Sequence, residues 1–211
     1  MVKPAGQPIS SETDENKEFV NLNSDVQFDD DYYKKEELSD SIADFMFSNQ
    51  AGAMYGPYFE DEMYKLSKLV DVKRLPDSVK IRKILIQPNR RTRDIRKAKQ
   101  LADSLEQEIK AGADFAALAR KHSAEQSTAT EGGYVGWIKK GEYQEAIVDS
   151  AIFAKTGEIM QVQSRNGFNI IKVVEKGRPV KKVQVATLTR RLEPSTETYQ
   201  NIYSKANKFV S

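Results

Sequence analysis

The chain has 211 residues, of which 39% are hydrophobic and 30% are charged, so it is long and apolar enough to bury a core. It contains no cysteine and one histidine, His122, which excludes disulfide scaffolds, zinc fingers, iron–sulfur clusters and multi-histidine metal sites. No stretch approaches the ~18 consecutive apolar residues of a membrane helix, and the Met1 end lacks the apolar run of a signal peptide. Because cysteine is missing and histidine occurs once, we expect no metal or other cofactor.

The net charge of +2 conceals two oppositely charged segments. Residues 1–75 contain 8 Lys and Arg against 16 Asp and Glu, whereas residues 76–211 contain 25 against 15. An acidic segment followed by a basic one indicates at least two structural units. The basic segment leaves nucleic-acid binding open at this point.

The first predicted elements are short. Residues 1–16 are polar and contain Pro and Gly, which predicts a disordered lead-in. Between Tyr32 and Phe47 apolar residues recur near helical spacing. Residues 64–70 alternate between polar and apolar side chains and predict a strand.

The middle of the chain has the clearest periodicity. Residues 79–86 predict a strand, and apolar residues at every third or fourth position predict a helix over 94–110. Asp114 is placed to cap a second helix, and residues 123–131 read as a polar loop. The remaining predicted elements are a strand at 134–138, a helix at 145–153 and a strand at 168–174. This order predicts an α+β domain with helices around a mixed sheet.

The last residues do not close a domain by themselves. Residues 183–189 predict a strand, and Ser195 begins a predicted helix. We expect residues 178–211 to open a further domain, and therefore expect the sequence to be a fragment of a longer protein.

The chain also resembles itself when it is shifted by 105 residues. Residues 32–47 then align with 137–152, and Gly52 falls on Gly157. Residues 32–70 are thus predicted to be a truncated copy of the latter half of the domain that follows, without a counterpart of helix 94–110. The alternative is chance similarity between two short α+β segments.

Five motifs, in the same order and spacing, resemble the parvulin (PpiC-type) family of peptidyl-prolyl cis-trans isomerases. They are KIRKILI from Lys80, GADFAALARKHS from Gly112, GGYVGW from Gly132, FAKTGEI from Phe153 and NGFNIIKV from Asn166. The resemblance covers about Val79 to Lys176. It implies a mixed four-stranded sheet surrounded by helices.

The resemblance also implies a domain plan and a cellular role. It predicts a lead-in at 1–16, a parvulin-like half repeat at 17–75, a parvulin-type domain at 76–177 and the opening of a further domain at 178–211. The repeat and the tail are similar to PpiD-type folding factors of the cell envelope. That similarity implies unfolded or proline-containing polypeptide clients and a location in the periplasm or cell envelope. The full-length protein would be anchored in the inner membrane and this fragment would be soluble.

The family's site residues transfer to this sequence only in part. An acidic or thiol position of the family falls on Glu125, while Lys83 and Asn169 stand where the family has two histidines. The residues expected to bind substrate are Val135, Tyr143, Ile147, Ser164 and Phe168. A buried lysine is costly unless it is paired, so Glu125 is its expected partner. We expect weakened isomerase activity; the alternative is a catalytically inactive parvulin-like chaperone or binding module.

Other polar features have simpler interpretations. The basic run at 90–97 predicts a solvated loop, although it leaves selection of acidic substrates open. It lacks the interleaved aromatic residues of nucleic-acid binders, so no nucleic-acid partner is expected. His122 is interpreted as structural, Trp137 as a core residue and Asp29–Asp31 as a solvated turn.

Overall fold

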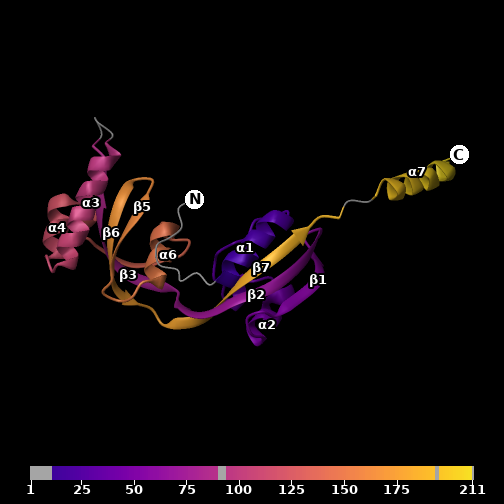
Figure 1. Cartoon of the computed structure of the whole chain (residues 1–211), viewed down its shortest axis with the longest axis horizontal. Coiled ribbons are helices and arrows are strands. Elements are labelled where there is room, and N and C mark those ends of the chain that lie inside the picture. The colour runs from indigo at the N-terminus through magenta and orange to yellow at the C-terminus, as the bar shows by residue number, and fades with distance from the viewer. Residues whose placement is uncertain (1–10, 90–93, 193–194, 211) are drawn as a thin grey trace. The chain divides into compact units, whose positions relative to one another are not determined.

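The computed structural model describes residues 11–89, 94–192 and 195–210, which form two compact units (Figure 1). Among the described residues, unit 1 lies within Arg74–Val180, and unit 2 combines those of 11–73 with those of 181–210. Unit 1 is therefore inserted into the sequence of unit 2. Among the described residues, no helix has both the length and the apolar character needed to cross a bilayer.

Unit 1 is built on a four-stranded sheet in the order β4-β3-β6-β5, in which every neighbouring pair is antiparallel. Its strands are β3 (Ser78–Ile86), β4 (Tyr134–Lys139), β5 (Ile159–Ser164) and β6 (Gly167–Lys176). Its helices are α3 (Ile95–Lys110), α4 (Phe115–His122), α5 (Gln126–Ala129) and α6 (Glu145–Phe153). The expected α+β fold is confirmed, but the sheet is antiparallel rather than mixed.

Helix α3 shows how the sequence positions the core of unit 1. Asp94 caps its first turn by accepting a hydrogen bond from the backbone N–H of Lys97 at 3.1 Å. The small and apolar side chains at three- and four-residue spacing then face the sheet, because 3.6 residues make one turn. Those of Ala98, Ala102 and Leu105 pack against β3 and β6. Helices α3 and α4 cover one side of the sheet, and α6 lies on the other (Figure 1).

Unit 2 has a three-stranded sheet in the order β1-β2-β7. Its strands are β1 (Met54–Glu60), β2 (Met63–Pro76) and β7 (Pro179–Arg190). Its helices are α1 (Ser11–Asn23), the 3-10 turn η1 (Lys35–Glu37), α2 (Asp40–Ser48) and α7 (Thr196–Val210). Ile42 and Met46 of α2 pack on one face of this sheet, and Val20 of α1 packs on the other.

The structure differs from the sequence expectations in several places. Residues 178–211 were expected to open a further domain, but strand β7 pairs with β2 in one sheet. This pairing joins strands that are distant in sequence, so no local pattern indicates it. Residues 11–16 belong to α1, and α5 lies inside the expected polar loop. Strands β1 and β5 had no predicted counterpart. The alternation in β5 is short, with Met160 and Val162 as its buried residues, and Gly56-Pro57 interrupts the alternation in β1. Residues 1–10 and 90–93 lie outside the described residues.

The paired glycines before β4 let two backbones approach closely. Gly133 has φ +80, in the left-handed region that side chains rarely adopt, and a Cβ there would lie 2.6 Å from the backbone oxygen of Lys83. The backbone N–H of Lys83 donates to the Gly133 oxygen at 2.7 Å. Gly133 thus holds the loop before β4 directly against β3.

We expect Gly133→Ala to destabilise the protein more than Gly141→Ala does. Both residues have φ +80, but a Cβ at Gly141 would meet nothing within 4 Å. Gly141→Ala should lower the free energy of unfolding by about 1–2 kcal/mol from backbone strain alone. Gly133→Ala should lower the free energy of unfolding by about 1–3 kcal/mol more, because of the steric clash. Urea unfolding of both variants measures the difference, and equal losses would contradict the close approach.

Candidate functional site

The centre of the candidate site is a buried ammonium group on the central strand β3. The Lys83 side chain is only 2% exposed. Lys83 lies opposite Ile171 in β6, and Leu85, two residues on, lies opposite Asn169. Since side chains alternate along a strand, Lys83 and Asn169 share one face of the sheet. That face is the one that α6 covers, away from α3 and α4.

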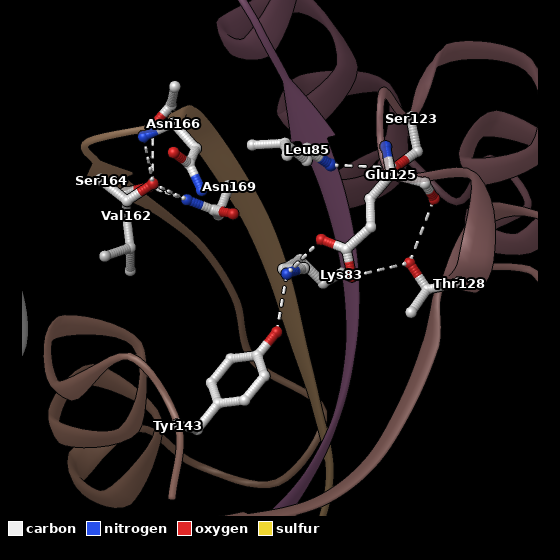
Figure 2. Close-up of polar contacts among 11 residues, drawn as sticks. Lys83, Leu85, Ser123, Glu125, Thr128, Tyr143, Val162, Ser164, Asn166 and Asn169 are labelled. Carbon is white, nitrogen blue, oxygen red and sulfur yellow. Dashed lines mark hydrogen bonds and ion pairs between the residues drawn. The ribbon is translucent and has the colours of Figure 1, made fainter. Parts of the chain in front are cut away.

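Two side chains hold the Lys83 ammonium in place (Figure 2). The Nζ atom lies 2.7 Å from Oε2 of Glu125, so the two form a salt bridge. It also donates a 2.6 Å hydrogen bond to the hydroxyl oxygen of Tyr143, which lies between β4 and α6. The same Nζ is 5.2 Å from the centroid of the Tyr143 ring, within cation–π distance.

The loop that carries Glu125 is tied to β3 by hydrogen bonds on both sides of one residue. The backbone N–H of Leu85 donates to Oγ of Ser123 at 3.1 Å. The backbone N–H of Ala124 donates to the Leu85 oxygen at 2.7 Å. Glu125 follows directly as the N-terminal flanking residue of α5. Its Oε1 accepts a long hydrogen bond of 3.4 Å from the hydroxyl of Thr128.

The pKa of Lys83 reflects a balance between burial and these partners. Burial by itself lowers the pKa of an ammonium, because it disfavours the charged form. The hydrogen bonds to Glu125 and Tyr143 outweigh that effect and hold the pKa of Lys83 above its ordinary value. Lys83 is therefore charged at neutral pH, and the Glu125 carboxylate is the opposite charge that pairs with it.

A second polar cluster lies on β5 and β6, beside the first (Figure 2). The Asn169 side chain is 1% exposed. It donates to Oγ of Ser164 at 3.0 Å and to the backbone oxygen of Val162 at 3.2 Å. The Ser164 hydroxyl also accepts from the backbone N–H of Asn166 at 3.3 Å. No dashed line in Figure 2 joins this cluster to Lys83, so Asn169 and Lys83 do not form one hydrogen-bonded pair among the residues drawn.

The apolar residues predicted to bind substrate are placed unequally. Val135 is half-buried in β4, and Ile147 is completely buried in α6. Phe168 does not join them. It packs in the core beneath α3 with Ile84 and Ile170, because adjacent residues of a strand point to opposite faces.

Sequence reasoning missed the polar role of Tyr143 and the anchoring role of Ser123. Tyr143 was expected only as a substrate-binding residue, since alignment with a family places a side chain but not its hydroxyl. A serine immediately after a helix was the one available signal for Ser123. Trp137 was expected in the core but is 48% exposed, and Lys80 Nζ lies 5.2 Å from its ring.

Other candidate groups lie elsewhere. Arg96 and Lys97 of the basic run are exposed at the start of α3, and His122 is half-buried at the end of α4. Within the described ranges, no three His, Cys, Asp or Glu side chains gather closely enough to hold a metal ion.

Removing the Glu125 carboxylate should destabilise the protein, because Lys83 would lose the partner that offsets its buried charge. Loss of one partner from a buried pair costs ~3–5 kcal/mol. Glu125 is itself 30% exposed, so we expect Glu125→Gln to lower the free energy of unfolding by about 1–3 kcal/mol. Asp103→Asn is the matched control, since it breaks the 2.8 Å pair with Lys99 on an exposed helix surface. It should cost below about 0.5 kcal/mol. If urea unfolding shows comparable losses for Glu125→Gln and Asp103→Asn, burial of Lys83 does not increase the cost of removing its partner.

The Lys83 ammonium should also make stability depend on pH at alkaline pH. Its folded-state pKa is raised, so its contribution is fully present below the ordinary lysine pKa of about 10.4. That contribution is lost as the pH rises through the folded-state value. The difference in unfolding free energy between wild type and Lys83→Met should therefore be constant from pH 7 to 9 and shrink above about pH 10. A difference that stays constant or grows through that range would contradict a raised pKa.

Comparison with known proteins places residues 64–177 in a family. A family model described as the PPIC-type PPIASE domain (Rotamase_3) matches residues 64–177, more than half of the chain. Chaperone SurA of Chromohalobacter salexigens is 30% identical over 151 residues, which cover 68% of this chain and 34% of that protein. Chaperone SurA of Pseudomonas fluorescens is 36% identical over 106 residues, 48% of this chain and 24% of that one.

The chain thus spans about a third or less of these relatives' length. A crystal structure of a PpiC-type peptidyl-prolyl cis-trans isomerase domain superposes with a TM-score of 0.44 and 26% identity. The superposition covers 49% of this chain and 94% of that domain. On the match to residues 64–177, the chain belongs to the PPIC-type, or parvulin, family of peptidyl-prolyl cis-trans isomerase domains.

Proposed function

We propose that unit 1 catalyses cis–trans isomerisation of Xaa-Pro bonds in unfolded polypeptides. The observation that carries this proposal is the Tyr143 hydroxyl, which is half-buried and bound at 2.6 Å by a fixed, charged Lys83. Membership of the parvulin family supports the reaction class. The roles of individual residues follow from what the reaction requires.

The reaction needs rotation about an amide and no covalent intermediate. Amide resonance sets a barrier of ~18–20 kcal/mol, and uncatalysed Xaa-Pro isomerisation takes tens to hundreds of seconds at about 25 °C. In the twisted transition state the amide loses resonance, and its nitrogen gains a lone pair that can accept a hydrogen bond. A site that holds the proline ring in an apolar pocket and offers a donor there binds the transition state more tightly than the planar amide.

Tyr143 is placed to be that donor. An ammonium group has no acceptor, so the hydroxyl hydrogen of Tyr143 cannot point to Lys83 and is left to donate elsewhere. Accepting a charged hydrogen bond polarises the hydroxyl and strengthens it as a donor. Lys83 is thus a positioning residue. Glu125 neutralises it, so that the site does not present a net charge to an apolar proline ring.

A second candidate function is binding without catalysis, as in a chaperone module. Two observations favour it: Asn169 is tied into a separate cluster, and Ile147 is completely buried and leaves no exposed apolar surface at that position. Both support the expectation that isomerase activity is weakened. The relatives named Chaperone SurA support unfolded polypeptides as clients under either function. A location in the periplasm or cell envelope, with the full-length protein anchored in the inner membrane, extends the same proposal.

Exchange NMR on a panel of Xaa-Pro peptides tests the catalytic proposal. Wild type should accelerate the exchange, and Tyr143→Phe, which removes only the hydroxyl, should reduce the acceleration at least tenfold. Tyr134→Phe is the matched control, since Tyr134 is an exposed tyrosine on β4. It should leave the rate unchanged.

Two results would overturn parts of this proposal. Unchanged acceleration in a folded Tyr143→Phe variant would remove the hydroxyl from the mechanism. Absence of acceleration in wild type, together with peptide-induced shifts at Val135 and Tyr143, would establish the binding module instead. Urea unfolding of each variant separates loss of the hydroxyl from loss of the fold.

A further inference from the structure

Helix α7 in unit 2 has an apolar face that no neighbour covers among the described residues. Tyr199, Ile202 and Tyr203 lie on one side of this helix, at helical spacing, and are 61%, 59% and 70% exposed. A helix of about 15 residues is marginally stable in water by itself, and most helices gain stability by packing such a face. The apolar face of α7 therefore requires a complementary apolar surface.

The sheet of unit 2 has a matching uncovered area on the face that α1 occupies. Val20 of α1 packs on Val70 of β2 there. Toward β1, on the same face, Met54 and Tyr64 are 57% and 45% exposed. The opposite face is occupied by α2. One helix therefore covers only part of a face that continues as exposed apolar side chains.

Unit 1 shows the same arrangement with two helices on that face. Helix α4 lies beside β3 through Ala119, and α3 covers the rest. The sheet positions under α3 include Ile170 and Phe168 of β6. In unit 2, β2 follows β1 through a tight turn, as β6 follows β5, and Tyr64 takes the place next to that turn that Phe168 takes in β6.

The hydrogen bonds of unit 2 repeat those that tie α4 to β3. The backbone N–H of Thr189 in β7 donates to Oγ of Ser24 at 2.9 Å, and the N–H of Asp25 donates to the Thr189 oxygen at 2.9 Å. Leu85 makes the same pair of bonds in unit 1, donating to Oγ of Ser123 and accepting from the backbone N–H of Ala124. In each unit the serine directly follows the helix that packs on the sheet, α1 or α4. Strand β7 thus stands where β3 stands, and α1 stands where α4 stands.

The strand register gives the same correspondence. Tyr33 forms an antiparallel bridge with Val183 of β7. In unit 1, Ile138 of β4 pairs with Val79 of β3. Tyr33 lies 105 residues before Ile138, which is the offset of the sequence repeat. Val183 lies 104 residues after Val79, the same offset that separates Thr189 from Leu85.

Helix α7 then follows β7 as α3 follows β3. Ser195 caps α7 by accepting from the backbone N–H of Thr198 at 3.2 Å, the same three-residue bond that Asp94 makes at α3. Counted from these caps, Tyr199 and Tyr203 correspond to Ala98 and Ala102, which are buried in unit 1. The link from Arg190 to Thr196 has five intervening residues, a usual length for a strand-to-helix connection.

We propose that unit 2 is a second parvulin-type fold and that α7 of the same chain completes it. The Tyr199, Ile202 and Tyr203 face docks on the exposed sheet surface around Met54 and Tyr64. In this arrangement α7 is the counterpart of helix α3, and unit 1 is inserted between the second fold's strands β2 and β7. This inference is independent of whether unit 1 catalyses isomerisation.

Disulfide trapping in the full chain tests the docking, because the protein has no cysteine of its own. Leu66 lies in β2 two residues from Tyr64, so strand alternation places it on the same face. The double variant Leu66→Cys, Tyr203→Cys therefore places one thiol on the proposed sheet surface and one on the apolar face of α7. Oxidation at low micromolar concentration should produce a disulfide within one chain, read as a faster monomer band on non-reducing gels. The double variant Leu66→Cys, Asn201→Cys is the control, since Asn201 lies on the opposite side of α7. It should form at least tenfold less of the disulfide within one chain.

A covalent dimer in place of the monomer band would show that α7 docks on a second copy, which overturns docking within one chain. Equal trapping by both double variants, or by neither, would overturn the docking itself. Hydrogen exchange provides a readout without cysteines. Amides of α7 should exchange at least tenfold more slowly in wild type than in Tyr203→Asp, with Asn201→Asp as the control. Unprotected α7 amides in wild type would equally overturn the proposal.

Discussion

The Lys83 ammonium is the interaction around which the site of unit 1 is organised. It lies on the central strand of the sheet, where an unpaired charge would be prohibitively costly. Its two partners come from different loops, Glu125 before α5 and Tyr143 before α6. The same charge therefore ties both loops to β3. Keeping the ammonium paired requires that these loops stay in one arrangement, which pre-organises the hydroxyl of Tyr143.

The backbone supports that arrangement independently of charge. Ser123 and Ala124 bracket Leu85 with two hydrogen bonds, and Gly133 approaches the backbone of Lys83 from the other side. Strand β3 is thus held along one short stretch by the loops on both sides of α5. The pair of hydrogen bonds recurs around Thr189 in unit 2, where no buried lysine occupies the equivalent place. These two bonds therefore form without the ammonium, which is specific to unit 1.

The ammonium of Lys83 limits which groups can contact it. An ammonium cannot accept a hydrogen bond, so every group that contacts it must be an acceptor. Tyr143 and Glu125 meet that requirement, whereas the amide of Asn169 turns to Ser164 and Val162. The polar groups thus divide into two clusters on one face of the sheet. This division is the physical reason to expect a slower isomerase, or a binder, from a parvulin fold.

Periodicity and local punctuation in the sequence were sufficient to locate most of unit 1. Helix α6 and the apolar stripe of α3 follow from 3.6-residue spacing, and the family motifs placed Lys83 and Glu125 near one another. The sequence alone could not show that β7 joins the sheet of β2, because that pairing is not local. Nor could it show that Phe168 faces the core or that the hydroxyl of Tyr143 reaches Lys83. Those outcomes depend on strand register and loop position, which are decided only when the distant segments pack together.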